Sequence, residues 1–454
     1  MKIALLPLYV KLYDDVVPSY HDKMLAFANA AAETLKQCGF EVEMPGDLCC
    51  IEREFNDAIK IFENAKCQVL VTLHTAYSPS LESINALADT DLPIVVFDST
   101  PDKTFEFDYG DKLMANHGIH GVQDMCNMLL QRGKKFLITA GHYQDEAFIE
   151  RLKKNIIAAG MTYKFTHAKV GTAGGVFAGM GDFRVPEGAF NMQVINYTDD
   201  PAYMPNELEI GDELLNDREN FHLAASLPPA MHRKTIIDSL KLRKWIEKNQ
   251  LDAFTINFLK CGKEMGFNVV PFLECSKAMA RNIGYAGEGD VLTALFCAAV
   301  MQANSETTFT EMFCPDWQGN RIFLSHMGEM NIALMDQKPH LADCKWIFSD
   351  SADDAAIAYG CLKSGKAVLA NIAPGPNGKF TIIASKITLT AQNDRNLKSM
   401  RGWFMPPCDM AVGEFLEKYS ELGGTHHLVL SYNLDIQYLK NFAKLTGCDF
   451  AEIC

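Results

Sequence analysis

KIALLPL, residues 2–8, is the first of several short apolar runs that decide the fold of this chain; QVLVTLH (68–74) and LPIVVFD (92–98) follow it. Amphipathic stretches of helical length, such as MLAFANAAAETLKQCG (24–39), lie between these runs. Strands that alternate with helices predict a parallel sheet covered on both faces, with ligands held by the loops at the carboxyl ends of the strands. His74 ends the second run, and we therefore expect it to lie near a ligand.

The length of 454 residues is too great for one hydrophobic core, and the patterns divide the chain into three domains. Residues 1–165 and 166–306 are each predicted to form a Rossmann-like (flavodoxin-like) domain with a parallel sheet. Residues 307–454 carry strands without regular helices between them, as in RIFLSHM (321–327) and HHLVLSY (426–432). This predicts an antiparallel β-barrel domain, and the fold class is therefore α/β with a C-terminal barrel.

Three further elements follow from local sequence. Residues 291–302 are apolar nearly all round, which predicts a buried helix with Asp290 as its N-cap. KWIFSD (345–350) is predicted to be a strand of the barrel domain, and residues 435–445 are predicted to form the last helix.

Composition excludes several functions. The formal net charge of -15 argues against a nucleic-acid or anionic-membrane partner, because both recruit clustered Lys and Arg. The 14 cysteines include no CxxC pair and are typical of reduced thiols, which predicts a cytoplasmic protein without a structural zinc site. No apolar run reaches the roughly 18 residues of a membrane span, and the first run is too short for a signal peptide.

Five residues are candidates for a catalytic metal site: Glu288, Glu311, His326 and the adjacent His426 and His427. Each lies in a short segment flanked by Gly, Phe or Ser. A mixture of carboxylate oxygen and imidazole nitrogen suits Mn²⁺, Co²⁺, Fe²⁺ or Zn²⁺ better than Ca²⁺, and manganese is our first expectation. Of the two adjacent histidines, we expect one to face the site and the other to face away.

Other interpretations of these segments compete with a site. Glu288 lies in a glycine-flanked turn, where a glutamate is often just solvated, and Glu311 could point to solvent from an alternating strand. The glycine-rich stretch KVGTAGGVFAGMGDF (169–183) lacks the GK[ST] ending of a phosphate loop and the strand-adjacent GxGxxG of a dinucleotide fold. We interpret its glycines as turn formers and predict no nucleotide.

Seven segments, taken in order, resemble the L-arabinose isomerase family and the related L-fucose isomerases. They are HTAYSP (74–79), GHYQD (141–145), AFTINF (253–258), YAGEGD (285–290), FTE (309–311), SHMGE (325–329) and GGTHH (423–427). The resemblance extends over most of the chain. It implies a metal-dependent enzyme that interconverts an aldose and its 2-ketose.

The resemblance also implies roles for individual residues. The metal ligands are expected to be Glu288, Glu311, His326 and His427, with the two glutamates as acid and base. The metal is expected to be Mn²⁺, with Co²⁺, Fe²⁺ or Mg²⁺ as alternatives. The residues expected to line the sugar are His74, His117, His120, Asp290, Phe309, Glu329 and His426. A homotrimer or homohexamer is implied, in which His120 completes the site of a neighbouring copy.

Departures from the family pattern concern the surroundings of the sugar. Tyr143 stands where the family commonly has Trp, Met312 and Phe313 replace an acidic-aromatic pair, and His117 stands in place of a glutamine. Arg401 is a candidate to hold an anionic substituent, so an isomerase of a modified hexose such as sulfoquinovose is an alternative. A non-catalytic sugar-binding regulator and a metal-dependent aldolase are further alternatives. The natural sugar, the metal and the choice between trimer and hexamer stay open at this stage.

Overall fold

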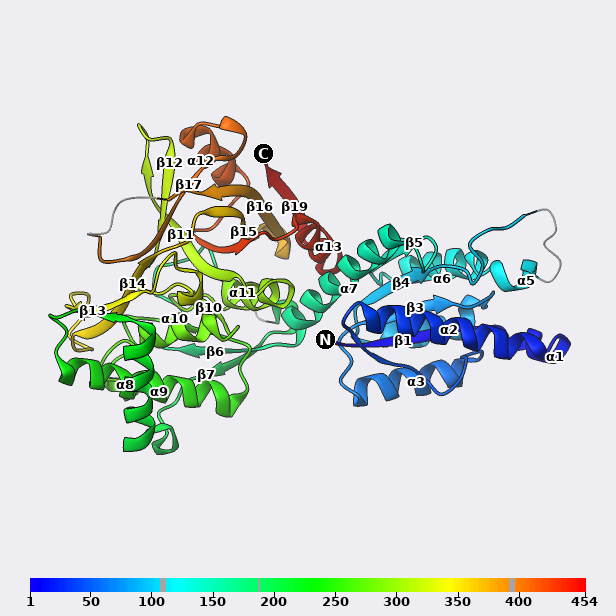
Figure 1. Cartoon of the computed structure of the whole chain (residues 1–454), viewed down its shortest axis with the longest axis horizontal. Coiled ribbons are helices and arrows are strands. Elements are labelled where there is room, and N and C mark those ends of the chain that lie inside the picture. Colours follow the sequence, from blue (N-terminus) through cyan, green and yellow to red (C-terminus); the bar gives the residue numbers. More distant parts are fainter. Residues whose placement is uncertain (107–111, 187, 392–396) are drawn as a thin grey trace. The chain divides into compact units, whose positions relative to one another are not determined.

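The computed structural model describes residues 1–106, 112–186, 188–391 and 397–454. These residues form two compact units (Figure 1). The N-terminal unit comprises residues 1–163 and 437–447, and the C-terminal unit comprises residues 164–436 and 448–454. The division into three domains stays a prediction.

The N-terminal unit contains a five-stranded parallel sheet in the order β2-β1-β3-β4-β5. Its strands are β1 (Lys2–Leu8), β2 (Glu41–Glu43), β3 (Leu70–His74), β4 (Ile94–Asp98) and β5 (Phe136–Ala140). This is the flavodoxin-like order, as the alternating pattern predicts. Successive side chains of β1 enter different cores: Ile3 and Leu5 join one buried cluster, whereas Ala4 and Leu6 join the other. The sheet is therefore covered on both faces, and His74 ends β3 as predicted.

Helices of this unit follow the predicted alternation. They are α1 (Lys11–Val16), α2 (Ser19–Gln37), α3 (Glu52–Asn64), α4 (Ser80–Asp89), α5 (Lys112–Asn116), α6 (Ile119–Gln131), α7 (Glu146–His167), which runs on into the C-terminal unit, and α13 (Ile436–Thr446). The last of these confirms the helix expected at residues 435–445.

The C-terminal unit begins with a four-stranded parallel sheet in the order β10-β9-β6-β7. Its strands are β6 (Lys169–Ala173), β7 (Gln193–Asn196), β9 (Ala253–Ile256) and β10 (Gly284–Gly287). The helices are α8 (Glu207–Asn220), α9 (Pro229–Asn249), α10 (Phe272–Ala280) and α11 (Val291–Ala303). Helix α11 is buried over most of its length, and Oδ1 of Asp290 accepts a hydrogen bond from the backbone N of Thr293 at 2.8 Å. Both predictions for this helix are confirmed.

A ten-stranded sheet completes the C-terminal unit, in the order β19-β16-β15-β18-β11-β12-β17-β14-β13-β8. The strands are β8 (His222–Leu223), β11 (Thr307–Asp316), β12 (Arg321–Ser325), β13 (His340–Cys344), β14 (Ala355–Cys361), β15 (Gly365–Pro374), β16 (Phe380–Leu389), β17 (Met400–Met405), β18 (His427–Tyr432) and β19 (Asp449–Ile453). An additional pairing joins β16 to β17.

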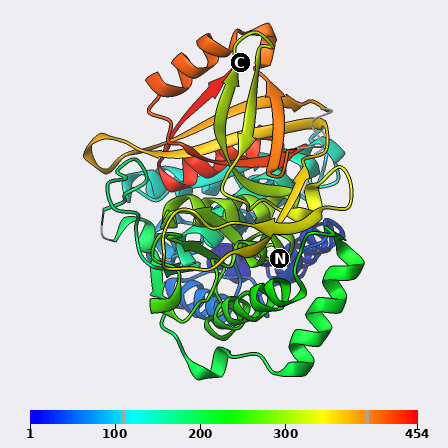
Figure 2. The same ribbon diagram turned by 90° about the vertical axis from the view of Figure 1, so that its left-hand side faces the viewer.

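Three expectations for residues 307–454 are wrong. The sheet is mixed, because β14 pairs in parallel with β17 and β16 pairs in parallel with β19. Period-2 alternation identifies strands but carries no information on the direction of their partners. Helix α12 (Val412–Glu421) interrupts the strands and lies beside β19 (Figure 2). Residues 345–350 form no strand, since the rings of Trp346 and Phe348 pack on Phe258 instead.

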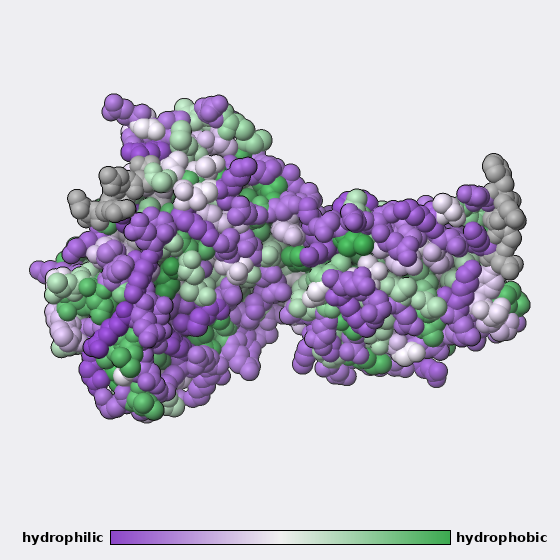
Figure 3. Space-filling model, viewed as in Figure 1, coloured by the Kyte–Doolittle hydropathy of each residue, from purple (hydrophilic) through white to green (hydrophobic). Residues whose placement is uncertain are grey.

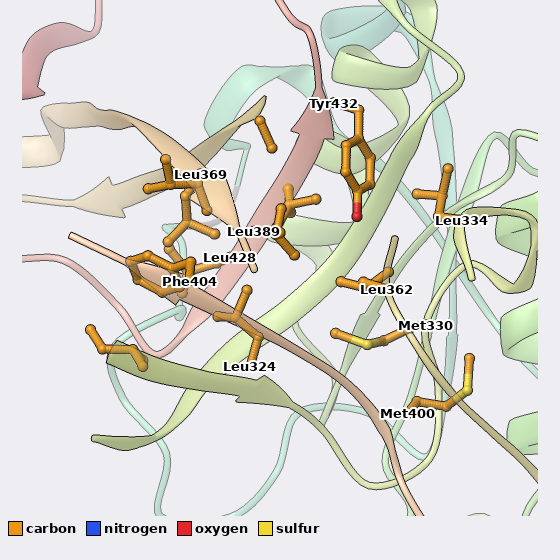
Figure 4. Packing of buried hydrophobic residues seen from close by; sticks show 14 of the residues in the cluster. Leu324, Met330, Leu334, Leu362, Leu369, Leu389, Met400, Phe404, Leu428 and Tyr432 are labelled. Carbon is orange, nitrogen blue, oxygen red and sulfur yellow. The ribbon is translucent and has the colours of Figure 1, made fainter. Parts of the chain in front are cut away.

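The hydrophobic core of the large sheet draws on strands that are far apart in sequence. Figure 4 shows Leu324, Leu369, Leu389, Phe404 and Leu428, which come from β12, β15, β16, β17 and β18, gathered in one cluster. These five side chains are 3% exposed or less. Their burial stabilises the sheet by roughly 1.5–3 kcal/mol for each large apolar side chain.

Hydrophilic residues cover most of the face that Figure 3 shows, and the hydrophobic residues form smaller patches among them.

Short 3-10 turns connect several elements; they are η1 (Ala189–Asn191), η2 (Pro201–Tyr203), η3 (Lys263–Met265), η4 (Ile332–Leu334), η5 (Pro376–Gly378) and η6 (Pro407–Asp409). None of the described helices has both the length and the hydropathy that crossing a bilayer requires.

Candidate metal centre

Glu288 lies in a strained turn between β10 and α11. Its φ of 60° is in the left-handed region, and the following Gly289 has a φ of 85°. Thr255 holds this turn: its Oγ1 donates to the carbonyl oxygen of Gly287 at 3.1 Å and accepts from the backbone N of Gly289 at 2.9 Å. A non-glycine residue in this region costs on the order of 1–3 kcal/mol and persists where its surroundings hold it. Only 8% of Glu288 is exposed, so it is not a solvated turn residue.

The glycines on each side of Glu288 are required by their neighbours. A Cβ atom on Gly287 would lie 2.6 Å from Cε1 of His326. A Cβ atom on Gly289 would lie 2.3 Å from the carbonyl oxygen of Gly175. The turn therefore packs directly against an imidazole on one side and against the glycine-rich loop after β6 on the other.

Strand register brings three further candidates together. Glu311 on β11 is paired with Ser325 of β12 on one side and with His427 of β18 on the other. His326 directly follows Ser325. The carboxylate of Glu311 is therefore placed between the two imidazoles, and the residue is only 9% exposed, so it does not point to solvent.

The Nε2 atoms of the three imidazoles face the two glutamates. From Oε1 of Glu311, the Nε2 of His427 lies at 3.2 Å, that of His326 at 3.6 Å and that of His426 at 3.7 Å. From Oε2 of Glu288, the Nε2 of His426 lies at 3.3 Å and that of His427 at 3.8 Å.

The expectation that one of the adjacent histidines faces away is wrong. Side chains alternate only within a strand, and β18 begins at His427, so His426 precedes the alternation. Both imidazoles therefore reach the same pair of carboxylates.

Each imidazole has a carboxylate beside its Nδ1 atom. The Nδ1 of His427 donates to Oδ2 of Asp290 at 2.9 Å, and that of His426 donates to Oδ2 of Asp182 at 2.5 Å. The Nδ1 of His326 lies 2.8 Å from Oε1 of Glu329. A carboxylate beside Nδ1 favours the proton there and leaves Nε2 to act as a metal ligand or to contact a substrate.

The acidic residues change the pKa values of this cluster. Burial lowers the pKa of His427, but its contacts with Asp290 and Glu311 outweigh burial and raise it to about 9. Burial likewise opposes protonation of His426, whose hydrogen bonds to Glu288 and Asp182 raise its pKa to about 9. Burial raises the pKa of Glu311, yet the neighbouring imidazoles, His326 first, bring it below its usual value. Glu311 is thus an ionised carboxylate in a buried site.

The geometry fits a divalent metal ion. Two groups of three residues, Glu288 with His426 and His427 and Glu311 with His326 and His427, offer ligand atoms within 4.8 Å of one another. Ligands about 2.0–2.2 Å from one ion must lie roughly 3–4.3 Å apart, which is the range of the contacts above. The buried Nε2 of His427 makes no hydrogen bond within the described part of the chain. An ion between the carboxylates would satisfy this nitrogen.

Three residues expected to line the sugar contact the imidazoles. Phe309 is fully buried, and its ring centroid lies 4.9 Å from that of His326 and 5.0 Å from that of His427. Asp290 and Glu329 are also fully buried and contact the Nδ1 atoms of the same imidazoles. Their contact with a sugar stays a prediction, whereas their contact with the imidazoles is present in the structure.

Three more of the seven residues expected to line the sugar lie in the N-terminal unit, whereas His426 lies in the C-terminal unit. His74 is 3% exposed, and burial lowers its pKa to about 3. The Nε2 atom of His117 is hydrogen-bonded to the hydroxyl of Tyr13 at 2.9 Å. His120 is exposed near the start of α6. Their roles stay predictions.

Four residues at the site were not predicted from the sequence: Thr255, Asp182, Phe183 and Tyr285. The ring of Phe183 stacks on His427 with centroids 5.1 Å apart and planes at 11°. The hydroxyl of Tyr285 donates to Oε1 of Glu329 at 2.7 Å. Thr255 lies in AFTINF and Tyr285 in YAGEGD, two segments that carried the resemblance, whereas Asp182 and Phe183 lie in the glycine-rich stretch that was interpreted as turns.

Arg401, the candidate anchor for an anionic substituent, is 3% exposed and donates to the carbonyl oxygen of Ser399 at 3.0 Å. Its burial and this local bond do not favour a modified, anionic sugar. Met312 follows Glu311 along β11 and is partly buried against the core of the large sheet, and Phe313 is 48% exposed.

Known proteins that resemble this chain are sugar isomerases. The family described as the L-arabinose isomerase C-terminal domain matches residues 306–449. The L-arabinose isomerase of Tolumonas auensis is 24% identical over 410 residues, which cover 85% of this chain and 80% of the relative. That of Actinobacillus succinogenes is 25% identical over 436 residues, 90% of this chain and 85% of the relative, and that of Mannheimia succiniciproducens is 26% identical over 414 residues, 85% and 81%.

The protein is therefore a relative of the sugar isomerases that act on aldoses. More particularly, the relatives that it resembles over most of its length are L-arabinose isomerases, and the resemblance drawn from its motifs is confirmed. The expected relation to the L-fucose isomerases stays a prediction.

Proposed function

We propose that this protein is a metal-dependent aldose–ketose isomerase, which interconverts an aldose and its 2-ketose through an enediolate. The observation that carries the proposal is the convergence of two buried carboxylates, Glu288 and Glu311, on three imidazoles. The names of the relatives, L-arabinose isomerases, support the same reaction and make L-arabinose the first sugar to test.

Four residues would hold the metal: Glu288, Glu311, His326 and His427. Their oxygen and nitrogen donors suit Mn²⁺, with Co²⁺, Fe²⁺ or Mg²⁺ as alternatives. The bound ion would polarise the two neighbouring oxygens of the open-chain sugar and stabilise the charge of the enediolate.

The protein's own carboxylates would move the proton. Isomerisation removes a proton from C2 of the aldose and returns one to C1, so it needs a base and an acid within reach of both carbons. Glu288 and Glu311 provide this pair. His426, whose side chain is 37% exposed, would meet the sugar from the side that solvent reaches.

Features of the assembly belong to the same proposal. The pairing of β16 with β17 links the two ends of the run β16-β15-β18-β11-β12-β17, which supports a closed barrel. The exposed position of His120 supports a homotrimer or homohexamer in which a neighbouring copy completes the site. All fourteen cysteines are free, which agrees with the reducing cytoplasm.

The proposal is tested by isomerisation in D₂O with added Mn²⁺. We expect deuterium at C1 or C2 of the product with L-arabinose or another aldose of a panel that includes L-fucose, D-galactose, D-arabinose and a sulfonated glucose. Glu311→Gln should abolish exchange, and metal analysis should find about one ion per chain in the unaltered protein.

Two results would contradict the proposal. A protein that binds a sugar with equal affinity in the presence and absence of metal, and in the Glu311→Gln variant, would be a regulator. Products of carbon–carbon cleavage would indicate an aldolase.

A further inference from the structure

The glycine-rich loop after β6, residues 174–183, touches the metal centre in places that the proposed ligand set does not explain. The backbone N of Phe177 donates to the carbonyl oxygen of Glu288 at 2.8 Å. Phe183, at the other end of the loop, is 2% exposed and stacks on His427. The loop, interpreted from the sequence as a set of turns, is therefore part of the wall of the site.

Asp182 provides the third contact between this loop and the site, and a single carboxylate oxygen provides it. Its Oδ2 accepts a hydrogen bond from Nδ1 of His426 at 2.5 Å and another from the backbone N of His426 at 3.2 Å. The same atom thus fixes both the ring and the backbone of one residue. Residues that are 244 positions apart in the sequence are joined by this double contact.

His426 needs such a contact more than the other imidazoles do. Its side chain is 37% exposed, whereas those of His326 and His427 are 2% and 0% exposed. It precedes β18, so no strand pairing holds its backbone, and Gly423 and Gly424 lie just before it. The rings of Phe183 and His427 lie beside it, with centroids 5.6 and 4.2 Å away, but a side chain that is this exposed samples several rotamers unless hydrogen bonds hold it.

We infer that Asp182 is a positioning residue that holds the His426 imidazole with its Nε2 toward Glu288 and Glu311, and so toward the reacting oxygens of the sugar. The inference rests on the proposed function and deepens it. In the held orientation, Nε2 lies 3.3 Å from Oε2 of Glu288 and 3.7 Å from Oε1 of Glu311. His426 then contacts the substrate, and Asp182 acts only through His426.

Loss of the Asp182 side chain should affect the binding of the sugar and of the metal differently. The hydrogen bonds described for Asp182 go to His426, which is outside the proposed ligand set. Its loss should weaken the handling of the sugar and leave the affinity for Mn²⁺ nearly unchanged. A hydrogen bond that involves a charged group is worth enough to change binding by about 10- to 100-fold.

The experiment compares Asp182→Ala, Asp182→Asn and Asp200→Ala in the full-length protein. Asp200 is a matched control, because its side chain is 38% exposed and it too accepts from a backbone N, that of Ala202, and from a cationic side chain, that of Lys248. Three quantities are measured: kcat and KM for L-arabinose, the Kd of Mn²⁺ by calorimetry, and the Kd of L-arabinitol. The last compound has no carbonyl group and cannot isomerise, so it reports binding alone.

We expect Asp182→Ala to lower kcat/KM and the affinity for L-arabinitol by about 10- to 100-fold, with the Kd of Mn²⁺ and the Tm within the range of Asp200→Ala. Asp182→Asn keeps an oxygen acceptor and should recover most of this loss. Failure of the asparagine variant to recover anything would overturn the inference, as would a parallel loss of Mn²⁺ affinity in Asp182→Ala or values equal to those of the unaltered protein. An unaltered protein that neither binds Mn²⁺ nor isomerises any aldose would instead overturn the proposed function.

Discussion

The candidate metal centre has a buried side and an open side, and on both sides a carboxylate contacts the Nδ1 atom of each imidazole. On the buried side, the imidazoles of His326 and His427 contact the fully buried carboxylates of Glu329 and Asp290. On the open side, the imidazole of His426 contacts Asp182, and both side chains are 37% exposed. A carboxylate beside Nδ1 therefore marks every imidazole of the site, whether or not solvent reaches it.

This difference indicates how the work of the site is divided. Electrostatic contacts are stronger where water is excluded, so the buried pairs fix their imidazoles firmly, as metal ligands require. The open pair is screened by solvent and can be reached by a sugar. Phe309, which is fully buried and whose ring contacts the imidazoles of His326 and His427, closes the buried side. On the proposed function, the sugar would approach from the side of His426, whose side chain is 37% exposed.

The largest effect is expected for Glu288, which lies where the two sides meet. On the proposed function, Glu288→Gln would remove a ligand charge and one of the two acid–base groups, so kcat/KM should fall by about 10³-fold or more. Steady-state kinetics with saturating Mn²⁺ measures this, with Glu414→Gln on α12 as a control in which a surface ion pair with Lys418 is lost. Activity within tenfold of the unaltered protein would remove Glu288 from the reaction.

A substitution that moves a ligand on the buried side should have the next largest effect. In Gly287→Ala the new Cβ atom would lie 2.6 Å from Cε1 of His326, and the ring must shift. Because displacement of a catalytic group by about 1 Å can cost 10²-fold, we expect activity and Mn²⁺ affinity both to fall by about that factor.

Gly413 provides the matched control for Gly287→Ala. A Cβ atom there meets nothing within 4 Å, so Gly413→Ala should change neither activity nor Mn²⁺ affinity. Calorimetry with Mn²⁺ distinguishes the two variants. Equal Mn²⁺ affinity in both would show that His326 is not a ligand.

Removing the charge of Glu329, which lies beside His326, tests directly whether the buried and the open side differ in function. Glu329→Gln keeps the shape of the side chain beside Nδ1 of His326 but loses its charge, so Mn²⁺ affinity should fall by about 10- to 100-fold. Sugar affinity at saturating Mn²⁺ should change little. The comparison predicts the opposite result for Asp182→Ala, and identical results for the two variants would mean that the site has no functional division into a buried and an open side.

Local sequence was sufficient to predict the parts of the site that are built within one segment. The βα repeat gave the parallel sheets, the end of β3 at His74, and the cap of α11 by Asp290, since each depends on residues close together in the chain. The glycines around Glu288 likewise marked a special turn.

Contacts between distant segments could not be predicted in the same way. Glu311, His326 and His427 meet because β11 pairs with β12 and β18 in one register, and nothing in a single strand specifies its partner. Asp182 was missed for a similar reason, because its partner His426 lies 244 residues further along the chain. The contact of Glu329 with Nδ1 of His326 did have a local signal, because Glu329 lies three residues after His326, whereas its expected contact with the sugar stays a prediction.

The smallest effect is expected from Tyr285, one step further from the metal on the buried side. Its hydroxyl donates to Oε1 of Glu329 at 2.7 Å, and the residue is fully buried. Tyr285→Phe removes this hydrogen bond, together with the contact between the hydroxyl and the Cys275 thiol, and no ring atom. A net hydrogen bond is worth about 1 kcal/mol, so Mn²⁺ affinity should fall by roughly fivefold.

Tyr432→Phe is the control for Tyr285→Phe, because Tyr432 is also buried and its hydroxyl donates to a backbone carbonyl, that of Lys363, rather than to a carboxylate of the site. Both variants should lose comparable stability in thermal unfolding, whereas only Tyr285→Phe should weaken Mn²⁺ binding. If the two variants bind Mn²⁺ equally well, the hydroxyl of Tyr285 does not contribute to Mn²⁺ binding, and Glu329 is the last residue on the buried side that does. If Tyr285→Phe weakens L-arabinitol binding while Mn²⁺ binding is unchanged, Tyr285 serves the open side, and the division between the two sides fails at this residue.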